Sequence, residues 1–302
     1  MNSRTIKHRI EYWVTYLVSA FARIIPYRLA LALGSFLGWL AFDALRVRRK
    51  VTLINLKNSS GKGKDELAKI GRRTYQNIGK SMVEYALFPS LDKEKILRMV
   101  RFEGTEHFDA ALKRGKGAIV VAGHFGSWEL MGAATRQKGY PVDFLVGEQH
   151  NLLIDDLMND YRRSVGIGII KMGAAAKGVI RALKNNRFVA MLSDQDAGSD
   201  GTVVEFFGRP ASTPKGPAAF ALKMDAPIIM GFIIRENQKK QRIIIEKPIF
   251  VEKTSDKEDD IQRLTQAYTR VLEEYIRKYP DHWFWPHRRW KSTTKEYERS
   301  TD

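Results

Sequence analysis

The sequence predicts an α/β fold: a mainly parallel central sheet flanked by helices, with an apolar helical membrane-associating segment at the N-terminus. From Arg101 onward, short apolar runs of strand length alternate with longer amphipathic stretches, a pattern typical of a parallel sheet covered on both faces. At 302 residues and 44% hydrophobic, the chain can bury one large core. We therefore expect the N-terminal segment over residues 1–50 and one α/β domain over residues 51–302.

The N-terminal segment is apolar but short. Its longest uncharged run, Leu29–Phe42, is 14 residues, whereas a spanning helix needs roughly 20. Basic clusters flank the apolar region at residues 4–9 and 46–50. One spanning helix would leave one cluster on the unfavourable side of the bilayer. Two helices broken near Pro26 and lying in the cytoplasmic leaflet would keep both clusters beside anionic headgroups. A hairpin packed on the domain and a single tilted anchor helix are the alternatives.

The later elements follow in order. After a glycine-containing linker that ends at residue 63, Asp65–Leu87 has the spacing of an amphipathic helix. Strands are predicted at 118–122, 142–146, 167–171, 188–193, 227–234 and 242–246. Helices are predicted at about 127–138, 151–165, 174–185, 214–224 and 258–279.

Composition narrows the classes of partner. The formal charge of +17 arises from 51 Lys and Arg against 34 Asp and Glu, and it predicts an anionic partner: nucleic acid, an acidic membrane or an acidic protein. The apolar N-terminal segment favours the membrane over nucleic acid. The absence of cysteine excludes a disulfide framework, a thiolate nucleophile and a Cys-ligated zinc site.

The most informative motif is Gly-His-Phe-Gly-Ser-Trp-Glu, which directly follows the strand 118–122. Ligands of open α/β sheets bind beyond the carboxyl ends of the strands, where His124 falls. His124 and Glu129 converge if the histidine lies in the turn and the glutamate in the first helical turn, a geometry that glycines make accessible. Such a histidine is suited to act as a general base on a hydroxyl. Glu129 could orient the ring or bind substrate, and the alternative for His124 is a buried, hydrogen-bonded histidine.

Ser127 raises the question of a serine nucleophile. A nucleophile elbow requires Gly-x-Ser-x-Gly, and His-Phe-Gly-Ser-Trp does not match it. We expect Ser127 to cap the helix that carries Glu129 instead.

The spacing of His124 and Glu129 resembles the His-x-x-x-x-Asp/Glu motif of glycerolipid-type acyltransferases. More narrowly, His-Phe-Gly-Ser-Trp-Glu resembles the motif of the bacterial lipid A biosynthesis (lauroyl/myristoyl) acyltransferase family, including its mycobacterial phosphatidylinositol mannoside relatives. Ser127, where the family usually has Asn, is the one departure. The resemblance extends to His287-Arg-Arg-Trp290 and covers nearly the whole chain.

Three further blocks carry the resemblance: 151–163, 194–196 and 206–217, and the last of these resembles a loop of the family. The first implies a functional arginine, Arg162 or Arg163, which could bind a phosphate or the developing oxyanion. In the second, Asp194 or Asp196 could orient the His124 ring, or the pair could form a loop cap or a salt bridge to Arg162. The aromatic tail 283–290 is expected mainly to pack on the domain.

The resemblance implies direct transfer of an acyl chain from a thioester to a hydroxyl of a lipid A precursor. His124 would act as general base, helped by Glu129 or an aspartate, with N–H groups near Gly126 and an arginine stabilising the oxyanion. No cofactor and no metal are expected. Acyl carrier protein is the expected donor, and coenzyme A is the alternative. The expected location is the cytoplasmic face of the bacterial inner membrane.

Three other functions remain open. The first is an acyl-CoA-dependent acyltransferase acting on a glycolipid or phosphatidylinositol mannoside. A thioesterase would use the same base with water as acceptor. A non-catalytic basic protein that binds membranes or nucleic acid would explain the charge but not the histidine motif.

Overall fold

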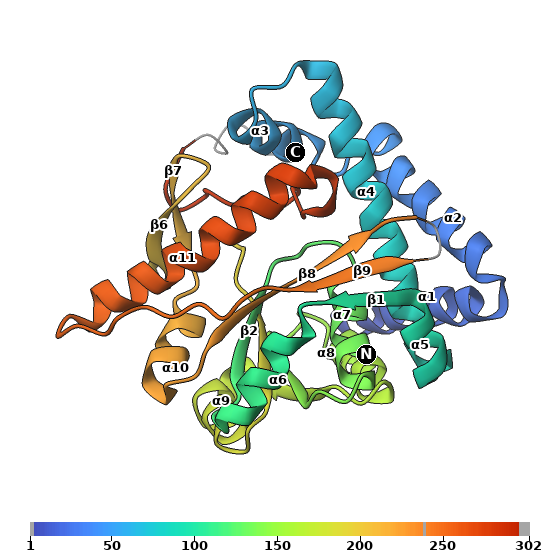
Figure 1. Cartoon of the computed structure of the whole chain (residues 1–302). Coiled ribbons are helices and arrows are strands. Elements are labelled where there is room, and N and C mark those ends of the chain that lie inside the picture. The colour runs from blue at the N-terminus through green and yellow to red at the C-terminus, as the bar shows by residue number, and fades with distance from the viewer. Residues whose placement is uncertain (1–2, 238–239, 296–302) are drawn as a thin grey trace.

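The computed structural model describes residues 3–237 and 240–295. Its centre is a seven-stranded sheet in the order β1-β9-β8-β2-β5-β3-β4 (Figure 1). Every neighbouring pair is parallel except β8–β9, which confirms the predicted mainly parallel sheet. The strands are β1 Val100–Glu103, β2 Ala118–Ala122, β3 Val142–Val146, β4 Gly168–Lys171, β5 Phe188–Leu192, β8 Ile228–Arg235 and β9 Gln241–Ile245.

Helices cover both faces of this sheet, as expected for a buried parallel sheet. Their bounds are α1 Ser3–Ile24, α2 Tyr27–Trp39, α3 Arg49–Ser59, α4 Lys64–Ala86, α5 Lys93–Met99, α6 Thr105–Arg114, α7 Trp128–Gln137, α8 Leu152–Ser164, α9 Ala175–Lys184, α10 Gly216–Met224 and α11 Lys257–Lys278. The central strand β2 is buried throughout. Its Ile119 and Val121 belong to the core formed with α9, α10 and α11, and Val120 belongs to the core formed with α5 to α8.

Each strand and helix predicted from residue 64 onward is present, with ends within two residues. Several elements were not predicted. They are β1, α3, α5, α6 and an antiparallel hairpin formed by β6 Thr202–Phe206 and β7 Arg209–Thr213. The interpretation of 206–217 as a loop was therefore wrong, because β7 and the start of α10 occupy most of it. The linker is also shorter than expected, because α3 continues to Ser59.

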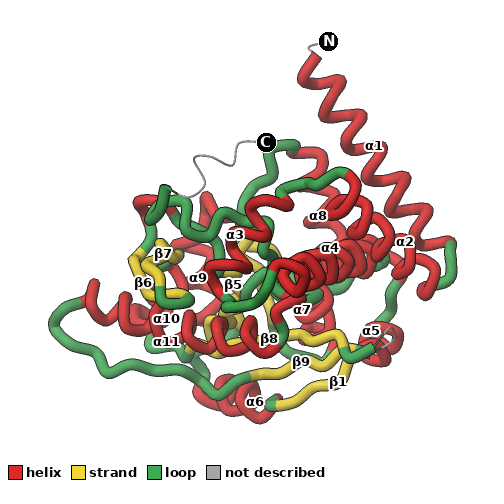
Figure 2. Tube along the Cα trace, turned by 90° about the horizontal axis from the view of Figure 1, so that it is seen from above, coloured by secondary structure: helices red, strands yellow, loops and turns green. Residues whose placement is uncertain are grey.

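The N-terminal helices are joined to the domain. Proline 26 separates α1 from α2, as predicted, and occupies the N-cap position of α2. Helix α2 packs closely on α4, since a Cβ atom added at Gly38 would lie 2.1 Å from the Tyr75 carbonyl oxygen. Helix α1 packs on α8, where the Ser19 and Tyr161 hydroxyls are 2.7 Å apart. Figure 2 shows the beginning of α1 extending away from the sheet.

The outward faces of α1 and α2 are apolar. The exposed large side chains are Ile6, Ile10, Trp13, Val14, Tyr16, Leu17, Val18, Phe21 and Ile24 on α1, and Leu29, Phe36, Leu37 and Trp39 on α2. Within the described residues, no helix is by itself both long and apolar enough to cross a bilayer. Tyr27–Ala44 and Arg49–Ser59, which meet at 89°, satisfy that requirement only when taken together, and only by length and composition.

Candidate active site

The histidine of the motif lies at the carboxyl edge of the sheet, directly after β2. Strand β5 pairs in parallel with β2, with Ala122 opposite Leu192. This register brings Asp194, two residues beyond β5, next to His124. The His124 Nδ1 atom lies 2.8 Å from Asp194 Oδ1. The structure therefore gives Asp194 the ring-orienting position that the sequence left open among Glu129, Asp194 and Asp196.

Asp194 is held from several directions. Its Oδ2 atom accepts hydrogen bonds from the His124 backbone N–H and from Trp283 Nε1, both at 2.8 Å. Burial by itself would raise the pKa of Asp194, but His124 and these donors hold it below its usual range. Asp194 is thus a carboxylate at neutral pH and accepts the proton of Nδ1. This tautomer leaves the Nε2 lone pair of His124 free to act as a base.

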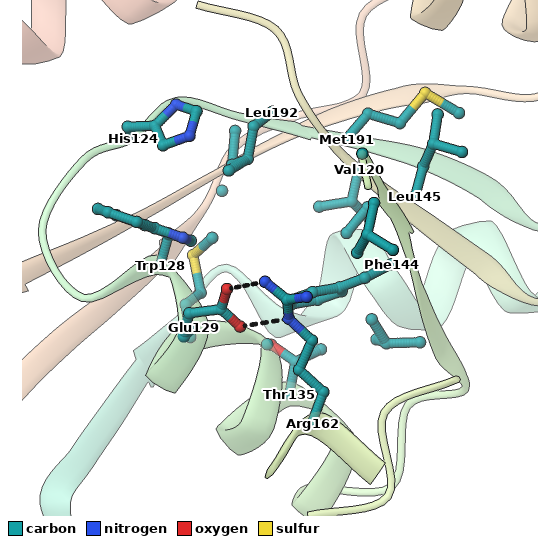
Figure 3. Close-up of a pocket in the computed structure, with 18 of the residues that line it drawn as sticks. Val120, His124, Trp128, Glu129, Thr135, Phe144, Leu145, Arg162, Met191 and Leu192 are labelled. Carbon is teal, nitrogen blue, oxygen red and sulfur yellow. Dashed lines mark hydrogen bonds and ion pairs between the residues drawn. The ribbon is translucent and has the colours of Figure 1, made fainter. Parts of the chain in front are cut away.

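The same contacts set the protonation of His124. Burial by itself would lower the pKa of His124, but Asp194, and less strongly Glu129, raise it above its ordinary value. The His124 ring is not sealed off, because 23% of its side chain remains exposed. Trp128 contacts the ring edge to face at 5.0 Å and lies between His124 and Glu129 in Figure 3.

Glu129 is paired with an arginine rather than with the histidine. It lies in the first turn of α7, and its two oxygens accept bonds of 2.6 Å and 3.1 Å from Arg162 on α8 (Figure 3). Asn159 Oδ1 accepts a third bond from Arg162, at 2.9 Å. The two charged side chains are 8% and 12% exposed. Three hydrogen bonds thus hold the Arg162 guanidinium, and both Arg162 and Glu129 line the same cavity as His124.

The neighbouring arginine has a different place. The side chain of Arg163 is 53% exposed and forms a surface ion pair with Asp160 at 2.7 Å. It does not line the cavity. Of the two arginines that the sequence offered, the structure brings Arg162 to the site.

Gly126 shapes the turn and does not supply an oxyanion donor. Its φ of +59° suits glycine, and a Cβ atom there would lie 2.2 Å from the Ile233 carbonyl oxygen. Its N–H already donates to the His282 carbonyl at 2.8 Å. Of the N–H groups near Gly126 that were expected to stabilise the oxyanion, that of Gly126 itself is therefore already used. The first turn of α7 contains other N–H groups, and the N–H groups of a first helical turn lack intrahelical acceptors.

Ser127 and Asp196 also differ from expectation. Ser127 occupies the N-cap position of α7 without making a side-chain capping bond, so the capping prediction was wrong. Its hydroxyl is buried and helps to lower the pKa of Glu84.

The carboxylate of Asp196 accepts a 2.6 Å bond from the Ser292 hydroxyl, and the backbone N–H of Asp196 donates to His287 Nε2. Asp196 therefore anchors the C-terminal segment rather than the histidine.

A cavity of about 400 Å³ extends from His124 along the face of the sheet that is covered by α7 and α8. His124, Glu129, Arg162 and Gln195 are among its polar lining residues. Farther along β2 and α7 the lining becomes almost entirely apolar. It includes Phe108, Val120, Ala122, Met131, Val142, Phe144, Ala190 and Ile245, with Thr135 as a polar exception. This volume lies in the range of small-molecule sites, and the apolar interior suits an aliphatic chain.

Sequence reasoning missed the role of Trp283. The tail containing it was expected to pack, and the burial of Trp283, Trp285 and Trp290 confirms this. The bond from the Trp283 indole N–H to Asp194 adds a contact to the site. The aromatic tail drew attention to this tryptophan, but only the fold reveals its partner.

Comparison with known proteins identifies the family of the chain. Residues 2–292 match the family described as bacterial lipid A biosynthesis acyltransferase. The chain is 26% identical over 292 residues to the Escherichia coli K12 lipid A biosynthesis lauroyltransferase, covering 93% of this chain and 92% of that protein. It is 22% identical over 290 residues to the Escherichia coli K12 lipid A biosynthesis palmitoleoyltransferase, with the same coverage.

A mycobacterial relative matches a shorter region. The phosphatidylinositol mannoside acyltransferase of Mycobacterium tuberculosis is 26% identical over 160 residues, which is 51% of each chain. The match therefore spans about half the length of that relative. The family match over residues 2–292 and the two alignments that cover nearly the whole chain decide the identification. This chain belongs to the bacterial lipid A biosynthesis acyltransferase family.

Proposed function

We propose that this protein is a membrane-associated O-acyltransferase. It moves a fatty acyl chain from an acyl thioester to a hydroxyl group of a lipid A precursor. One observation carries the proposal: a histidine oriented by Asp194 stands at an apolar cavity of about 400 Å³. The base is placed to activate a hydroxyl, and the cavity is suited to hold the acyl chain.

In the proposed mechanism, Nε2 of His124 accepts the proton of the acceptor hydroxyl as its oxygen attacks the thioester carbonyl. Asp194 stabilises the resulting imidazolium. Arg162 and the free N–H groups at the start of α7 stabilise the oxyanion. When the intermediate collapses, the C–S bond breaks, the imidazolium returns its proton to the thiolate, and an ester and a thiol leave. No acyl-enzyme forms on the path.

The charge and the family support particular substrates. A formal charge of +17 favours the acidic acyl carrier protein as donor, although coenzyme A thioesters are also anionic. The two relatives matched over nearly their full length are named for lipid A biosynthesis, which supports a lipid A precursor as acceptor. The mycobacterial match over half the chain keeps a CoA-dependent glycolipid acyltransferase as the second candidate.

Membrane association is part of the proposal. The exposed apolar faces of α1 and α2 lie beside the basic residues that precede α3, an arrangement suited to the cytoplasmic face of the bacterial inner membrane. Helix α1 also contacts the start of α8, because the side chain of its N-cap residue, Asn151, donates to the His8 carbonyl at 2.9 Å. An enzyme attached in this way would meet both lipid substrate and soluble donor.

The test is to replace His124 by Ala and to measure acyl transfer from acyl carrier protein to a lipid A precursor in membranes. We expect a loss of about 10²- to 10⁴-fold, the usual contribution of a general base. The control is His107→Ala, which removes a histidine on α6 outside the cavity. Retained activity in a folded His124→Ala protein would refute the base assignment. Hydrolysis that proceeds as fast as transfer, with the lipid acceptor present, would favour a thioesterase.

A further inference from the structure

A second cavity, of about 470 Å³, lies between α2, α4 and the end of β8. It shares no lining residue with the cavity at His124, which we call the acyl cavity after its proposed role. It is nevertheless close to the histidine motif, because Lys80 in its wall directly precedes Ser81, whose hydroxyl donates to the Gly126 carbonyl. We call it the cationic cleft, after three of its lining residues, Arg28, Lys80 and Arg235.

The cleft carries positive charge that the protein does not neutralise. Within residues 3–237 and 240–295, the side chains of Arg28 and Lys80 make no hydrogen bond and no ion pair. Arg235 is bonded to Glu84, at 2.7 and 2.8 Å. That carboxylate is fully buried and also accepts bonds from Tyr27 and Gln241. Glu84 is thus bonded to Arg235, whereas the side chains of Arg28 and Lys80 have no bonded carboxylate within the described residues.

The surroundings of Lys80 show the same imbalance. Lys80 is half-buried. Burial and the nearby Arg235 lower its pKa, against a smaller opposing effect of Glu84 and Asp281. An unpaired ammonium in this position is stabilised by an anionic ligand, which would add charge-assisted hydrogen bonds.

The rim of the cleft is apolar and exposed. Leu29, Ala32 and Phe36 follow one another along α2 at helical spacing, and Leu29 and Phe36 are 60% and 53% exposed. Arg28, Leu31 and Ser35 form the neighbouring stripe, which lines the cleft. A ligand with an anionic head and an apolar body would thus find both its parts accommodated, the head among cations and the body along the exposed stripe.

We propose that the cationic cleft binds the phosphate group of a membrane lipid, whether a bulk phospholipid or the acceptor lipid. Phosphate matches the converging guanidinium and ammonium donors, and the apolar rim selects a lipid over a soluble phosphate. The lipid source rests on the proposed membrane association, whereas phosphate recognition itself does not. A headgroup bound there would hold α2 against the membrane surface. Because α2 packs on α4, and Ser81 of α4 is bonded to Gly126, it would also hold the loop that carries His124.

The first experiment measures binding of soluble ligands to the full chain by calorimetry. The probes are dihexanoylphosphatidic acid below its micelle concentration, dihexanoylphosphatidylcholine and inorganic phosphate. We expect the phosphatidic acid to bind at least about tenfold more tightly than the other two, and Arg28→Gln with Lys80→Gln to weaken it about tenfold or more. The matched control, Lys177→Gln with Lys184→Gln, removes the same charge from exposed positions on α9 and should leave binding unchanged.

The second experiment separates the phosphate from surface charge. Vesicles of phosphatidylcholine carry either phosphatidylglycerol or oleate as the anionic component. We call Arg28→Gln with Lys80→Gln the cleft variant, and Lys177→Gln with Lys184→Gln the α9 variant. We expect the native chain to prefer phosphatidylglycerol, the cleft variant to lose this preference, and the α9 variant to keep it. Restoration of the preference by Arg28→Lys with Lys80→Arg would confirm that charge in the cleft is required. If the cleft variant fails to fold, the single Arg28→Gln substitution, at an exposed position, takes its place.

Three results would overturn the proposal: equal losses in the cleft and α9 variants, inorganic phosphate binding as tightly as the phosphatidic acid, or no binding of the phosphatidic acid by the native chain. The sources are separated by kinetics. A raised KM for the acceptor in the cleft variant, with unchanged vesicle binding, identifies the acceptor as the ligand. Lipid binding without any acyl transfer would retain this proposal and refute the proposed function.

Discussion

Two buried carboxylate networks lie near the histidine motif at residues 123–129, one around Asp194 and the other around Glu84. They differ in how far their basic partners are used up by the carboxylate. In the first network, Asp194 is bonded to Nδ1 of His124, and the His124 ring lines the cavity of about 400 Å³. On the α4 side, both oxygens of Glu84 are bonded to Arg235. The first network orients a group that remains 23% exposed, whereas the second surrounds a carboxylate with no exposed surface, and its Arg235 is 10% exposed in the wall of the cationic cleft. A buried charge pair alone therefore does not identify a candidate active site. In this chain the candidate site is distinguished by a partly exposed histidine ring that lines a cavity.

The largest effect that tests this comparison is expected from Asp194→Asn. The amide cannot stabilise an imidazolium, and it disturbs the tautomer that frees Nε2. We expect kcat for acyl transfer to fall by about 10³- to 10⁴-fold, as for other oriented histidine bases. The measurement is single-turnover transfer to a lipid A precursor, with thermal unfolding as a check on folding.

Trp283→Phe provides the graded control. It removes one donor to Asp194 and leaves the carboxylate in place, so we expect a loss of about tenfold or less. If Asp194→Asn were as active as Trp283→Phe, Asp194 would be a structural partner and the contrast between the two networks would fail.

The opposite result is expected on the other side of the loop. Glu84→Gln leaves the Arg235 guanidinium buried without its counter-charge, and we expect the free energy of unfolding to fall by about 3–5 kcal/mol. Urea unfolding of the full chain measures this loss. Glu94→Gln, in an exposed pair with Arg98, is the control and should cost less than about 1 kcal/mol. A stable Glu84→Gln protein with abolished transfer would instead place this network in catalysis.

The arginine pair on α8 gives a third, smaller effect. Arg162→Lys replaces a two-bond fork with a single ammonium, and we expect kcat/KM to fall by about 10- to 10²-fold. Arg163→Lys, one position along the same helix, should behave like the native chain because its side chain lies outside the cavity. Equal effects of the two substitutions on steady-state transfer would remove Arg162 from the site.

These contrasts mark the boundary of what the sequence could predict. Strand β2 and the place of His124 follow from an apolar run that ends in a glycine-bracketed motif, which is local information. The choice of Asp194 over Glu129 depends on the register that sets Ala122 opposite Leu192. The partner of the Gly126 N–H is His282, near the other end of the chain. Such pairings arise from tertiary packing and leave no local pattern.

The unpredicted hairpin shows a second limit. Its two-residue turn places Phe207 at a φ of +54°, followed by Gly208 at +69°. Turns of this kind usually carry Asn or Asp before the glycine. Phenylalanine therefore gave no turn signal. Packing explains the phenylalanine at this position, since Phe207 is 8% exposed and contacts the Phe206 ring edge to face.

The smallest predicted effect is on the pH dependence of transfer. Asp194 and Glu129 raise the pKa of His124 above its ordinary value, against the lowering effect of burial. The base works only when neutral, so kcat/KM should rise with pH until it passes this raised pKa and then level off. Removing a carboxylate removes part of the stabilisation of the imidazolium, so the acidic limb should move to lower pH. The shift should be larger in Asp194→Asn than in Glu129→Gln, because Asp194 contacts the ring directly. Rate profiles of the native chain and both variants measure it, and an acidic limb that stays in place in both would show that another group controls the rate.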